Sequence, residues 1–326
     1  MARVLITGAA GFIGSHIIRI LLDTGHEVLG LDFFQQYIHP LRPTFLENMN
    51  YRFEVLLKGT ELKRVNTLST DTMRRAIHRF NPTHVIHLAA LPLANIAIHH
   101  PEEAFDSIVK GTVNLLEAMR DLEGLERFVY TSSSMIYGDF DTDPMPEDGR
   151  KEPKEIYGGM KLCGEILTKV FSQRYGIPYN IVRPSAVFGP TDNNRRVLQI
   201  FLEKAFRKKP ILVTNPETRL DFTYIKDAAQ GFLDIAFSGA ANEEFNMTRG
   251  NSTSLGEAAA AVKRHFPDLV VEERIKNDTY RPERGALDVS KARTLAGYKP
   301  KYDLESGLVE YVDYMRRYNR SITENQ

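Results

Sequence analysis

Two residues of the chain, Tyr157 and Lys161, have the types and spacing of a general base and the group that tunes it. They stand four residues apart in a segment with helical periodicity, so both side chains are expected on one helix face. A nearby ammonium favours the phenolate, and we therefore expect Lys161 to lower the tyrosine pKa from its reference value of roughly 10. Such a phenolate could take a proton from a hydroxyl group near neutral pH.

A run of hydroxyl residues, TSSS at 131–134, supplies a candidate partner for this base. It ends an expected strand, and ligands bind at the carboxyl ends of strands in parallel sheets. Ser133 precedes Tyr157 by 24 residues, and its hydroxyl could hydrogen-bond the oxygen that Tyr157 deprotonates, stabilising charge there. The alternative interpretation is a polar turn that only closes the strand.

A glycine-rich loop near the N-terminus has the pattern of a phosphate-binding turn. The sequence TGAAGFIG at 7–14 follows a short apolar run and opens an amphipathic segment. Gly8 would permit the tight turn, Gly11 the close approach of the backbone to a pyrophosphate, and Gly14 the close packing of helix on strand. An ordinary strand-to-helix turn is the alternative.

An acidic residue stands near the expected distance from this loop. Asp32 ends the expected strand at 27–32, 18 residues past Gly14. In dinucleotide-binding folds a carboxylate there holds the adenosine ribose hydroxyls and repels a 2′-phosphate. Because Phe33 and Phe34 follow it, and not Arg or Lys, we predict NAD and not NADP as the cofactor. A solvated strand end is the alternative interpretation of Asp32.

Composition excludes several classes of function. The chain has 326 residues, and Lys+Arg and Asp+Glu both count 42, so zero net charge gives no support for nucleic acid or an anionic membrane as partner. Cys163 is the only cysteine and the histidines show no ligand spacing, so we expect neither a disulfide nor a metal site. No apolar run approaches the ~20 residues of a membrane span, and no signal-peptide pattern is present. We expect a cytoplasmic protein.

Strands and helices that could position these residues alternate along the first half of the chain. Expected strands are RVLIT (3–7), EVLGLD (27–32), HVIHLAA (84–90), RFVYTSS (127–133) and PYNIVRP (178–184), and expected helices are 12–24, 71–80, 101–121 and 155–175. This alternation predicts an α/β fold, a doubly wound parallel sheet (Rossmann fold) with helices on both faces. We expect it over residues 1–180, with a smaller α/β substrate lobe over 181–326 and segments near 219–240 returning to the first domain.

Residues 33–60 interrupt the alternation, because they are too long for a plain strand-to-helix connection. We expect a partly helical insertion there, beside the adenosine end of the cofactor. Beyond residue 184 the expected helices are 194–208, 226–237, 254–265 and 303–318, and the last six residues are expected to be frayed.

Together these motifs resemble the extended short-chain dehydrogenase/reductases, specifically the NAD-dependent nucleotide-sugar epimerase/dehydratase family. The matching stretches occur in family order: TGAAGFIG at 7–14, HLAA at 87–90, SSSMIYG at 132–138, YGGMK at 157–161 and LDFTYIKDAAQG at 220–231. The resemblance covers nearly the whole chain. It is very specific for fold and cofactor and much less specific for substrate.

The resemblance implies roles by position. Tyr157 is then the base, Ser133 its hydroxyl partner, and Lys161 the group that also binds the nicotinamide ribose. Cofactor contacts beyond the glycines and Asp32 are expected from Phe12, Ile13, Thr67, Leu68, His87, Leu88, Ala89, Ala90 and Pro184. Substrate contacts are expected from Ser134 and from Arg219 and Arg281, whose guanidinium groups suit a diphosphate. For each arginine a solvated surface position is the alternative.

The resemblance also implies a homodimer through the helices at 101–121 and 155–175. Candidate apolar contacts are Ala104, Val113, Leu116, Leu162, Ile166 and Val170. Intramolecular core is the alternative for most of them.

Departures from the family pattern narrow the reaction. Ser134 and Met135 stand where dehydratases of the family carry Asp-Glu, decarboxylases also favour Glu at the second position, and 3,5-epimerases place Cys there. Met135 cannot act as an acid or base. Ile108, Ala186 and Leu220 replace residues usual in the family, and they indicate an outlying specificity.

What remains is chemistry that needs a hydride and one proton. The leading hypothesis is an NAD-dependent nucleotide-sugar 4-epimerase acting on a UDP-hexose or UDP-hexuronate through a transient 4-keto sugar. A faint similarity of the 33–60 segment to glucuronate 4-epimerases makes the hexuronate plausible. The alternatives are a nucleotide-sugar dehydrogenase or 4-keto-sugar reductase with net redox, and a non-catalytic NAD-sensing protein.

Overall fold

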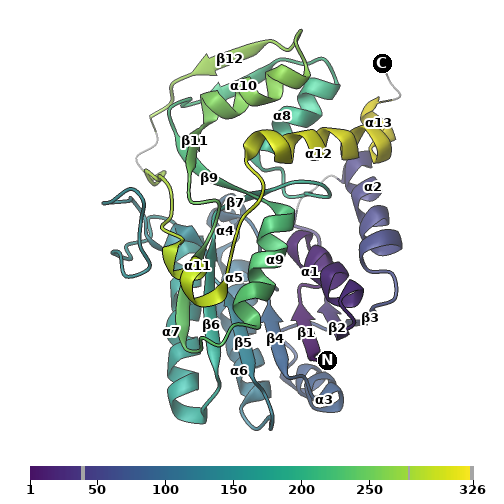
Figure 1. The fold of residues 1–326 in the computed structure, drawn as a ribbon, viewed down its shortest axis with the longest axis vertical. Coiled ribbons are helices and arrows are strands. Elements are labelled where there is room, and N and C mark those ends of the chain that lie inside the picture. Colours follow the sequence, from purple (N-terminus) through teal and green to yellow (C-terminus); the bar gives the residue numbers. More distant parts are fainter. Residues whose placement is uncertain (38–40, 278–279, 324–326) are drawn as a thin grey trace.

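A seven-stranded parallel sheet forms the centre of the molecule in a computed structural model that describes residues 1–37, 41–277 and 280–323 (Figure 1). The strands are β1 (Arg3–Thr7), β2 (Glu27–Asp32), β3 (Glu61–Arg64), β4 (His84–His87), β5 (Arg127–Thr131), β6 (Tyr179–Pro184) and β10 (Glu243–Met247). Their order is β10-β6-β5-β4-β1-β2-β3. The chain thus winds outward from β1 in both directions, which confirms the predicted doubly wound sheet.

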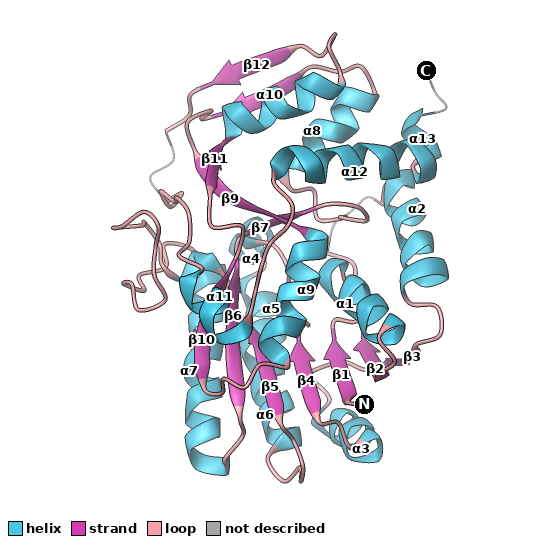
Figure 2. Cartoon of the chain, in the orientation of Figure 1, coloured by secondary structure: helices cyan, strands magenta, loops and turns pink. Residues whose placement is uncertain are grey.

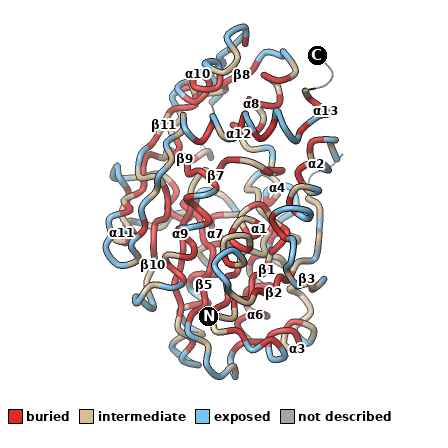
Figure 3. Tube along the Cα trace, turned by 45° about the vertical axis from the view of Figure 1, so that its right-hand side comes forward, coloured by how far each residue is buried: buried red, intermediate tan, exposed pale blue. Residues whose placement is uncertain are grey.

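Successive side chains along each strand point to opposite faces of the sheet, and they contribute to two separate hydrophobic cores, one on each face. Val4 and Ile6 pack with α1 (Phe12–Asp23) and α9 (Ile225–Ala236), whereas Leu5, between them, packs on the opposite face. That opposite face is covered by α3 (Thr70–Phe80), α6 (Gly111–Met119) and α7 (Ile156–Tyr175). Burial is concentrated in the central strands and in the helix faces against them (Figure 3).

The two edge strands escaped the sequence analysis. β3 has the sequence ELKR and is largely exposed, and β10 begins with two partly exposed glutamates. Polar edge strands resist pairing with other chains, but they lack the apolar run that marks a buried strand. Two expected strands are also shorter than predicted, because β4 ends at His87 and β5 at Thr131.

The expected helix at 101–121 is interrupted. It consists of α5 (Pro101–Phe105), a π-helical turn at Asp106–Lys110, and α6, and it follows a short helix that was not expected, α4 (Ala94–His99). The 33–60 insertion is partly helical as predicted, with α2 (Pro43–Tyr51) running into a second π-helical turn at Arg52–Leu56.

A smaller α/β lobe, as predicted, lies at the carboxyl edge of the sheet, toward which the arrowheads of the central strands point (Figure 2). Its strands and helices are β7 (Ala186–Phe188), β8 (Ile211–Thr214), β9 (Arg219–Tyr224), β11 (Ser252–Ser254), β12 (Val271–Arg274), α8 (Val197–Phe206), α10 (Leu255–His265), α12 (Leu304–Tyr318) and α13 (Arg320–Thr323). Two elements of this half of the chain lie with the central sheet: α9 packs on α1, and β10 pairs with β6. A further helix, α11 (Ser290–Ala296), contacts β10. The division at residue 180 stays a prediction.

The expected helices at 194–208, 226–237, 254–265 and 303–318 correspond to α8, α9, α10 and α12. Of the last six residues, expected to be frayed, 321–323 belong to α13 and 324–326 lie outside the described residues. Within the described part of the chain, no helix combines the length and the apolar character needed to cross a membrane.

Candidate active site

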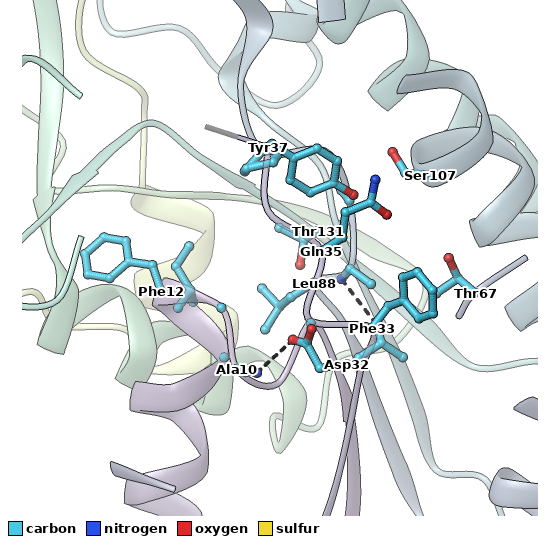
Figure 4. Close-up of a pocket in the computed structure, with 18 of the residues that line it drawn as sticks. Ala10, Phe12, Asp32, Phe33, Gln35, Tyr37, Thr67, Leu88, Ser107 and Thr131 are labelled. Atoms are coloured by element: carbon cyan, nitrogen blue, oxygen red, sulfur yellow. Dashed lines mark hydrogen bonds between the residues drawn. The ribbon is translucent and has the colours of Figure 1, made fainter. Parts of the chain in front are cut away.

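A cavity of about 550 Å³ opens at the carboxyl edge of the sheet, between the sheet and the smaller lobe (Figure 4). The expected cofactor and catalytic residues that line it are Gly8, Gly11, Phe12, Ile13, Gly14, Asp32, Thr67, Leu68, Leu88, Ala89, Ala90, Ser133, Tyr157, Lys161 and Pro184. Residues from the ends of six strands, β1 to β6, and from the 33–60 insertion therefore surround one space. Four other expected residues, His87, Ser134, Arg219 and Arg281, are not part of its lining.

The glycine loop has the backbone geometry that a phosphate site needs. Gly8 has φ +71°, and a Cβ there would lie 2.8 Å from the backbone nitrogen of Ala89. A Cβ at Gly14 would lie 2.4 Å from the carbonyl oxygen of Gly8, so only glycine allows α1 to begin this close to β1. No side chain caps the helix at Gly11, which leaves its first amides free to face an anion.

The Asp32 carboxylate ties this loop to the end of β2. Its Oδ2 accepts a hydrogen bond from the Ala10 amide at 2.8 Å (Figure 4). Its Oδ1 accepts one from the Phe34 amide at 2.7 Å. Burial raises the pKa of Asp32, whereas these amide bonds act to lower it. Each carboxylate oxygen keeps a second lone pair, so Asp32 can still accept bonds from ribose hydroxyls.

Two buried hydroxyls in the cavity wall also fit a bound dinucleotide. Thr131 Oγ1 and Ser132 Oγ are buried, and neither has a hydrogen-bond partner among the described residues. Buried polar groups without partners are rare and point to a ligand. With the glycine loop and Asp32, these hydroxyls make the cavity a suitable site for NAD. Sequence reasoning grouped this run of hydroxyl residues but named neither of the two.

Tyr157, Lys161 and Ser133 converge at the end of the cavity nearest α7. Lys161 Nζ lies 5.8 Å from the centre of the Tyr157 ring and donates to the carbonyl oxygen of Thr131 at 2.8 Å. Ser133 Oγ accepts from the Met135 amide at 3.2 Å, so its own O–H remains available to donate to a ligand. The predicted base and its hydroxyl partner thus face the same space.

The expectation that Lys161 lowers the pKa of Tyr157 is wrong for this arrangement. Burial raises the pKa of Tyr157 to about 12, and the opposing influence comes from the cationic Arg196. Burial also lowers the pKa of Lys161 to about 7, against the stabilising influence of Glu165. The lysine is itself desolvated and points toward a backbone carbonyl, so it is a poor source of positive charge for the tyrosine.

Arg196 is a cavity residue that the sequence analysis missed. It immediately precedes α8, lines the cavity, and donates to the Val187 carbonyl at 3.1 Å. The segment at 190–196 carries two adjacent arginines after a strand, but the sequence does not indicate which one points inward.

His87 lies behind the cavity wall and does not line it as expected. Its Nδ1 lies 2.7 Å from Thr7 Oγ1 and its Nε2 lies 3.1 Å from Thr112 Oγ1. Burial lowers the pKa of His87 to about 3, so the ring stays neutral. It supports the strand ends, whereas the three residues after it reach the cavity.

Arg219 does not reach the cavity. Its guanidinium donates to Ser252 Oγ at 2.9 Å and to the Ser252 carbonyl at 2.8 Å, and 42% of its side chain is exposed. It therefore links β9 to β11 at the surface, which is the alternative stated for it above. Arg281 is half-buried near Arg284, and Ser134 lies under the wall, within 3.3 Å of Ser185 Oγ.

The 33–60 insertion supplies a buried arginine that the sequence analysis also missed. Arg52 donates from Nη1 to the Ala10 carbonyl at 2.9 Å and from Nη2 to the Thr191 carbonyl. It therefore clamps the glycine loop to the segment that precedes α8. Several insertion residues, Phe45 and Met49 among them, line the cavity, so the insertion does lie at the site.

The sequence matches a family model described as "NAD dependent epimerase/dehydratase family" over residues 4–248. UDP-glucuronate 4-epimerase 1 of Arabidopsis thaliana is 30% identical over 336 residues, covering 97% of this chain and 77% of that protein. The UDP-glucuronate 4-epimerase of Thermodesulfobacterium geofontis is 28% identical, with 97% of both chains covered.

Solved structures give the same picture. A UDP-glucuronic acid 4-epimerase from Bacillus cereus, in complex with UDP-glucuronic acid and NAD, has a TM-score of 0.86 and 26% identity, covering 97% of this chain and 99% of that one. A UDP-glucose 4-epimerase from Thermotoga maritima, with UDP-glucose, has a TM-score of 0.83 and 27% identity at the same coverage.

Proposed function

Because the chain belongs to the NAD dependent epimerase/dehydratase family, we propose that it is a nucleotide-sugar 4-epimerase that uses NAD and acts on a UDP-hexose or UDP-hexuronate. The observation that carries the proposal is the convergence of Tyr157 and Ser133 on one space, with the apolar Met135 where elimination of water would need an acid. The relatives named above act on UDP-sugars at carbon 4, which supports the same reaction.

Two names describe the parts of the cavity from here on. The cofactor end comprises residues 7–14 and Asp32, and the catalytic end comprises Ser133, Tyr157 and Lys161. The glycine loop amides would hold the pyrophosphate, and the Asp32 carboxylate would hold the adenosine ribose. When bound, NAD supplies a positively charged ring that takes a hydride from carbon 4 of the sugar and returns it.

The side chains of the catalytic end handle the proton. Tyr157 takes it from the 4-hydroxyl while Ser133 donates a hydrogen bond to the same oxygen. The cationic Arg196 lowers the cost of the phenolate that this step requires. The resulting 4-keto sugar rotates in the cavity so that the opposite face of carbon 4 meets the cofactor. Tyr157 returns the proton to the 4-oxygen when the hydride adds to that face. No net oxidation results.

The proposal is tested with purified protein and two pairs of 4-epimers, UDP-glucose with UDP-galactose and UDP-glucuronate with UDP-galacturonate. Nuclear magnetic resonance spectra should show that, for at least one pair, either sugar nucleotide is converted into its 4-epimer until the two reach equilibrium. No interconversion of either pair would contradict the proposal. A stoichiometric rise or fall of absorbance at 340 nm would instead support a dehydrogenase or reductase.

We also propose that two copies associate through the helices α5, α6 and α7. Phe105, Ile166 and Val170 are large apolar residues exposed on these helices. Of the contacts expected from sequence, Ala104 and Leu116 are fully buried within the chain, so they cannot contribute. Sedimentation velocity should give the mass of a dimer, and charged substitutions at Ile166 and Val170 should give a monomer; a monomeric wild type would contradict the proposal.

A further inference from the structure

A second cavity, of about 610 Å³, lies outside the candidate active site, and among the described residues the two share no lining residue. It is bordered by α1 and α9, which lie side by side, by α12 and by the end of α2 (Figure 1). Its volume is close to the 550 Å³ of the first cavity and falls in the range of sites that hold small molecules. The reaction proposed above assigns no role to it.

Tyrosine rings form much of the wall of the second cavity. Tyr51 packs against Tyr318, with ring centres 4.7 Å apart, and against Tyr314, with ring centres 5.0 Å apart. Tyr224 and Tyr302 form another pair, with ring centres 4.5 Å apart. All five tyrosines line the cavity. Because aromatic faces stack well on other flat rings, this wall favours a ligand with a planar aromatic ring.

The carboxylates around the second cavity already have donors from the chain itself. Glu310 accepts from the Tyr224 hydroxyl at 2.6 Å, from the Tyr302 hydroxyl at 2.8 Å and from Lys226 Nζ at 2.6 Å. The other acids of the lining are held by backbone amides, by a glutamine and by an arginine, and they are Asp227, Asp234 and Asp313. A cationic ligand would therefore have to displace one of these donors.

The polar groups of the lining that lack partners can all donate. Tyr298 Oη and Arg19 Nε are buried, and neither has a hydrogen-bond partner in the part of the chain that the structure describes. The exposed Lys299 and Lys301 also line the cavity, and their ammonium groups form no salt bridge with a described carboxylate. Buried polar groups without partners are rare and point to a ligand, which here must bring acceptors. Two ammonium groups suit a phosphate, which carries about two negative charges near pH 7.

The wall of the second cavity is continuous with the support of the glycine loop. Tyr51 directly precedes Arg52, which donates to the carbonyls of Ala10 and Thr191. His16 also lines the second cavity, and its Nε2 lies 3.3 Å from Thr191 Oγ1. A ligand that holds Tyr51 and His16 in place restricts the same segments that NAD needs ordered. The two ligands should therefore bind with positive cooperativity.

We propose that the second cavity is an effector site for a planar aromatic phosphate, and that its occupation tightens the binding of NAD. The ring stacks on the tyrosines, the phosphate lies by Lys299 and Lys301, and acceptor atoms of the ligand face Tyr298 Oη and Arg19 Nε. The inference concerns the cofactor and not the sugar, so its test is independent of the 4-epimerase reaction.

The first test measures binding to protein that is saturated with NAD, with UDP present, so that the active site is occupied. Calorimetry with 1-naphthyl phosphate, which has neither a ribose nor a uracil, should show one site, and 1-naphthol and inorganic phosphate should each bind roughly tenfold more weakly. Lys301→Met should weaken 1-naphthyl phosphate on the order of tenfold, whereas the matched control Lys209→Met, at an exposed lysine after α8, should bind it like the wild type. No binding to the wild type, or unchanged affinity in Lys301→Met, would overturn the inference.

Tyr298→Phe separates a ligand contact from a structural role, because it removes only the buried hydroxyl. Since that hydroxyl has no partner in the described chain, the variant should unfold at the same or a higher temperature without ligand. It should nevertheless bind 1-naphthyl phosphate on the order of tenfold more weakly. A variant that is destabilised and binds 1-naphthyl phosphate normally would show that the hydroxyl serves the fold, and would contradict its place in the site.

The effector role is tested by titrating NAD with and without saturating 1-naphthyl phosphate. The affinity for NAD should rise about fivefold, and NAD should raise the affinity for 1-naphthyl phosphate by the same factor, because coupling is reciprocal. Equal affinity for NAD in both titrations would overturn the effector role. In protein saturated with NAD and UDP, displacement of 1-naphthyl phosphate by GMP would identify a nucleotide as the effector, and displacement by phosphotyrosine but not by GMP would identify a smaller aromatic phosphate.

Discussion

The cofactor end and the catalytic end of the cavity are assembled from different ranges of the chain. The cofactor end comes from residues 7–14 and Asp32, which are close in sequence, and it works through backbone amides and glycine geometry. The catalytic end and the side chains next to it, Ser134, Ser185 and Arg284, come from four segments, near residues 133, 157, 185 and 284. A short motif can therefore define the cofactor, whereas the substrate depends on side chains that only the tertiary structure brings together.

Replacing Tyr157 with Phe should greatly reduce catalysis without weakening the binding of NAD at the cofactor end. Loss of the general base should lower kcat by roughly 100- to 10 000-fold. NAD affinity and thermal stability should stay close to those of the wild type, as should all properties of Tyr175→Phe, which alters an exposed tyrosine of the same helix. Turnover within tenfold of the wild type would show that another group is the base.

Lys161 should make stability depend on pH in a defined window. Its folded pKa of about 7 lies below its ordinary value of 10.5, so between these values the unfolded chain binds more protons than the folded one. Stability should therefore rise with pH from about 7 to 10.5 more steeply in the wild type than in Lys161→Met. Urea denaturation without added nucleotide measures both slopes, and identical slopes would mean that the lysine is not desolvated.

A substitution at Arg52 tests whether the glycine loop of the cofactor end depends on support from the 33–60 insertion. Replacing it with Met leaves the carbonyls of Ala10 and Thr191 without their donor, which should cost about 2 kcal/mol of stability. The glycine loop should also lose its fixed position, so NAD affinity should fall roughly tenfold. Arg207→Met, at the end of α8, is a matched control. Unchanged affinity would show that the loop needs no support from the insertion.

Two neighbouring glycines of α7, Gly158 and Gly159, differ in how closely other residues pack against them, so alanine substitutions there test the packing at the catalytic end. A Cβ at Gly158 would lie 2.4 Å from the Met135 carbonyl, so Gly158→Ala should push the serine run away from Tyr157, costing about 1–3 kcal/mol of stability and at least tenfold in kcat. Gly159 has open space around its Cβ position, and Gly159→Ala should stabilise the helix by about 0.5–1 kcal/mol. Thermal unfolding and initial rates measure both, and similar effects of the two substitutions would contradict this packing.

Apolar runs and helical periodicity predicted the five inner strands and the helices that cover them, because burial on both faces leaves a clear pattern. The edge strands β3 and β10 could not be found in this way, since their side chains are largely polar. The motifs also placed Tyr157 and Lys161 correctly on one helix. Their pKa values depend on burial by distant segments, which spacing does not reveal.

The arginines show more clearly that the sequence alone does not reveal the surroundings of a side chain. The sequence around Arg219 and around Arg284 does not indicate where either guanidinium points. Arg219 is held by Ser252 on the next strand, whereas Arg284 is half-buried beside Ser134 because its segment is hydrogen-bonded to residues some 140 positions earlier. The direction in which each guanidinium points is therefore decided by long-range contacts.

The central claim is that a hydride leaves carbon 4 of the sugar and returns to the same carbon while Tyr157 holds the proton. Its most direct test follows a UDP-hexose or UDP-hexuronate that carries deuterium at carbon 4, in ordinary water, by nuclear magnetic resonance. The account predicts that the 4-epimer forms with the deuterium still on carbon 4 and that no reduced cofactor accumulates. Appearance of the epimer without its deuterium, or of a keto sugar with stoichiometric reduced cofactor, would contradict it.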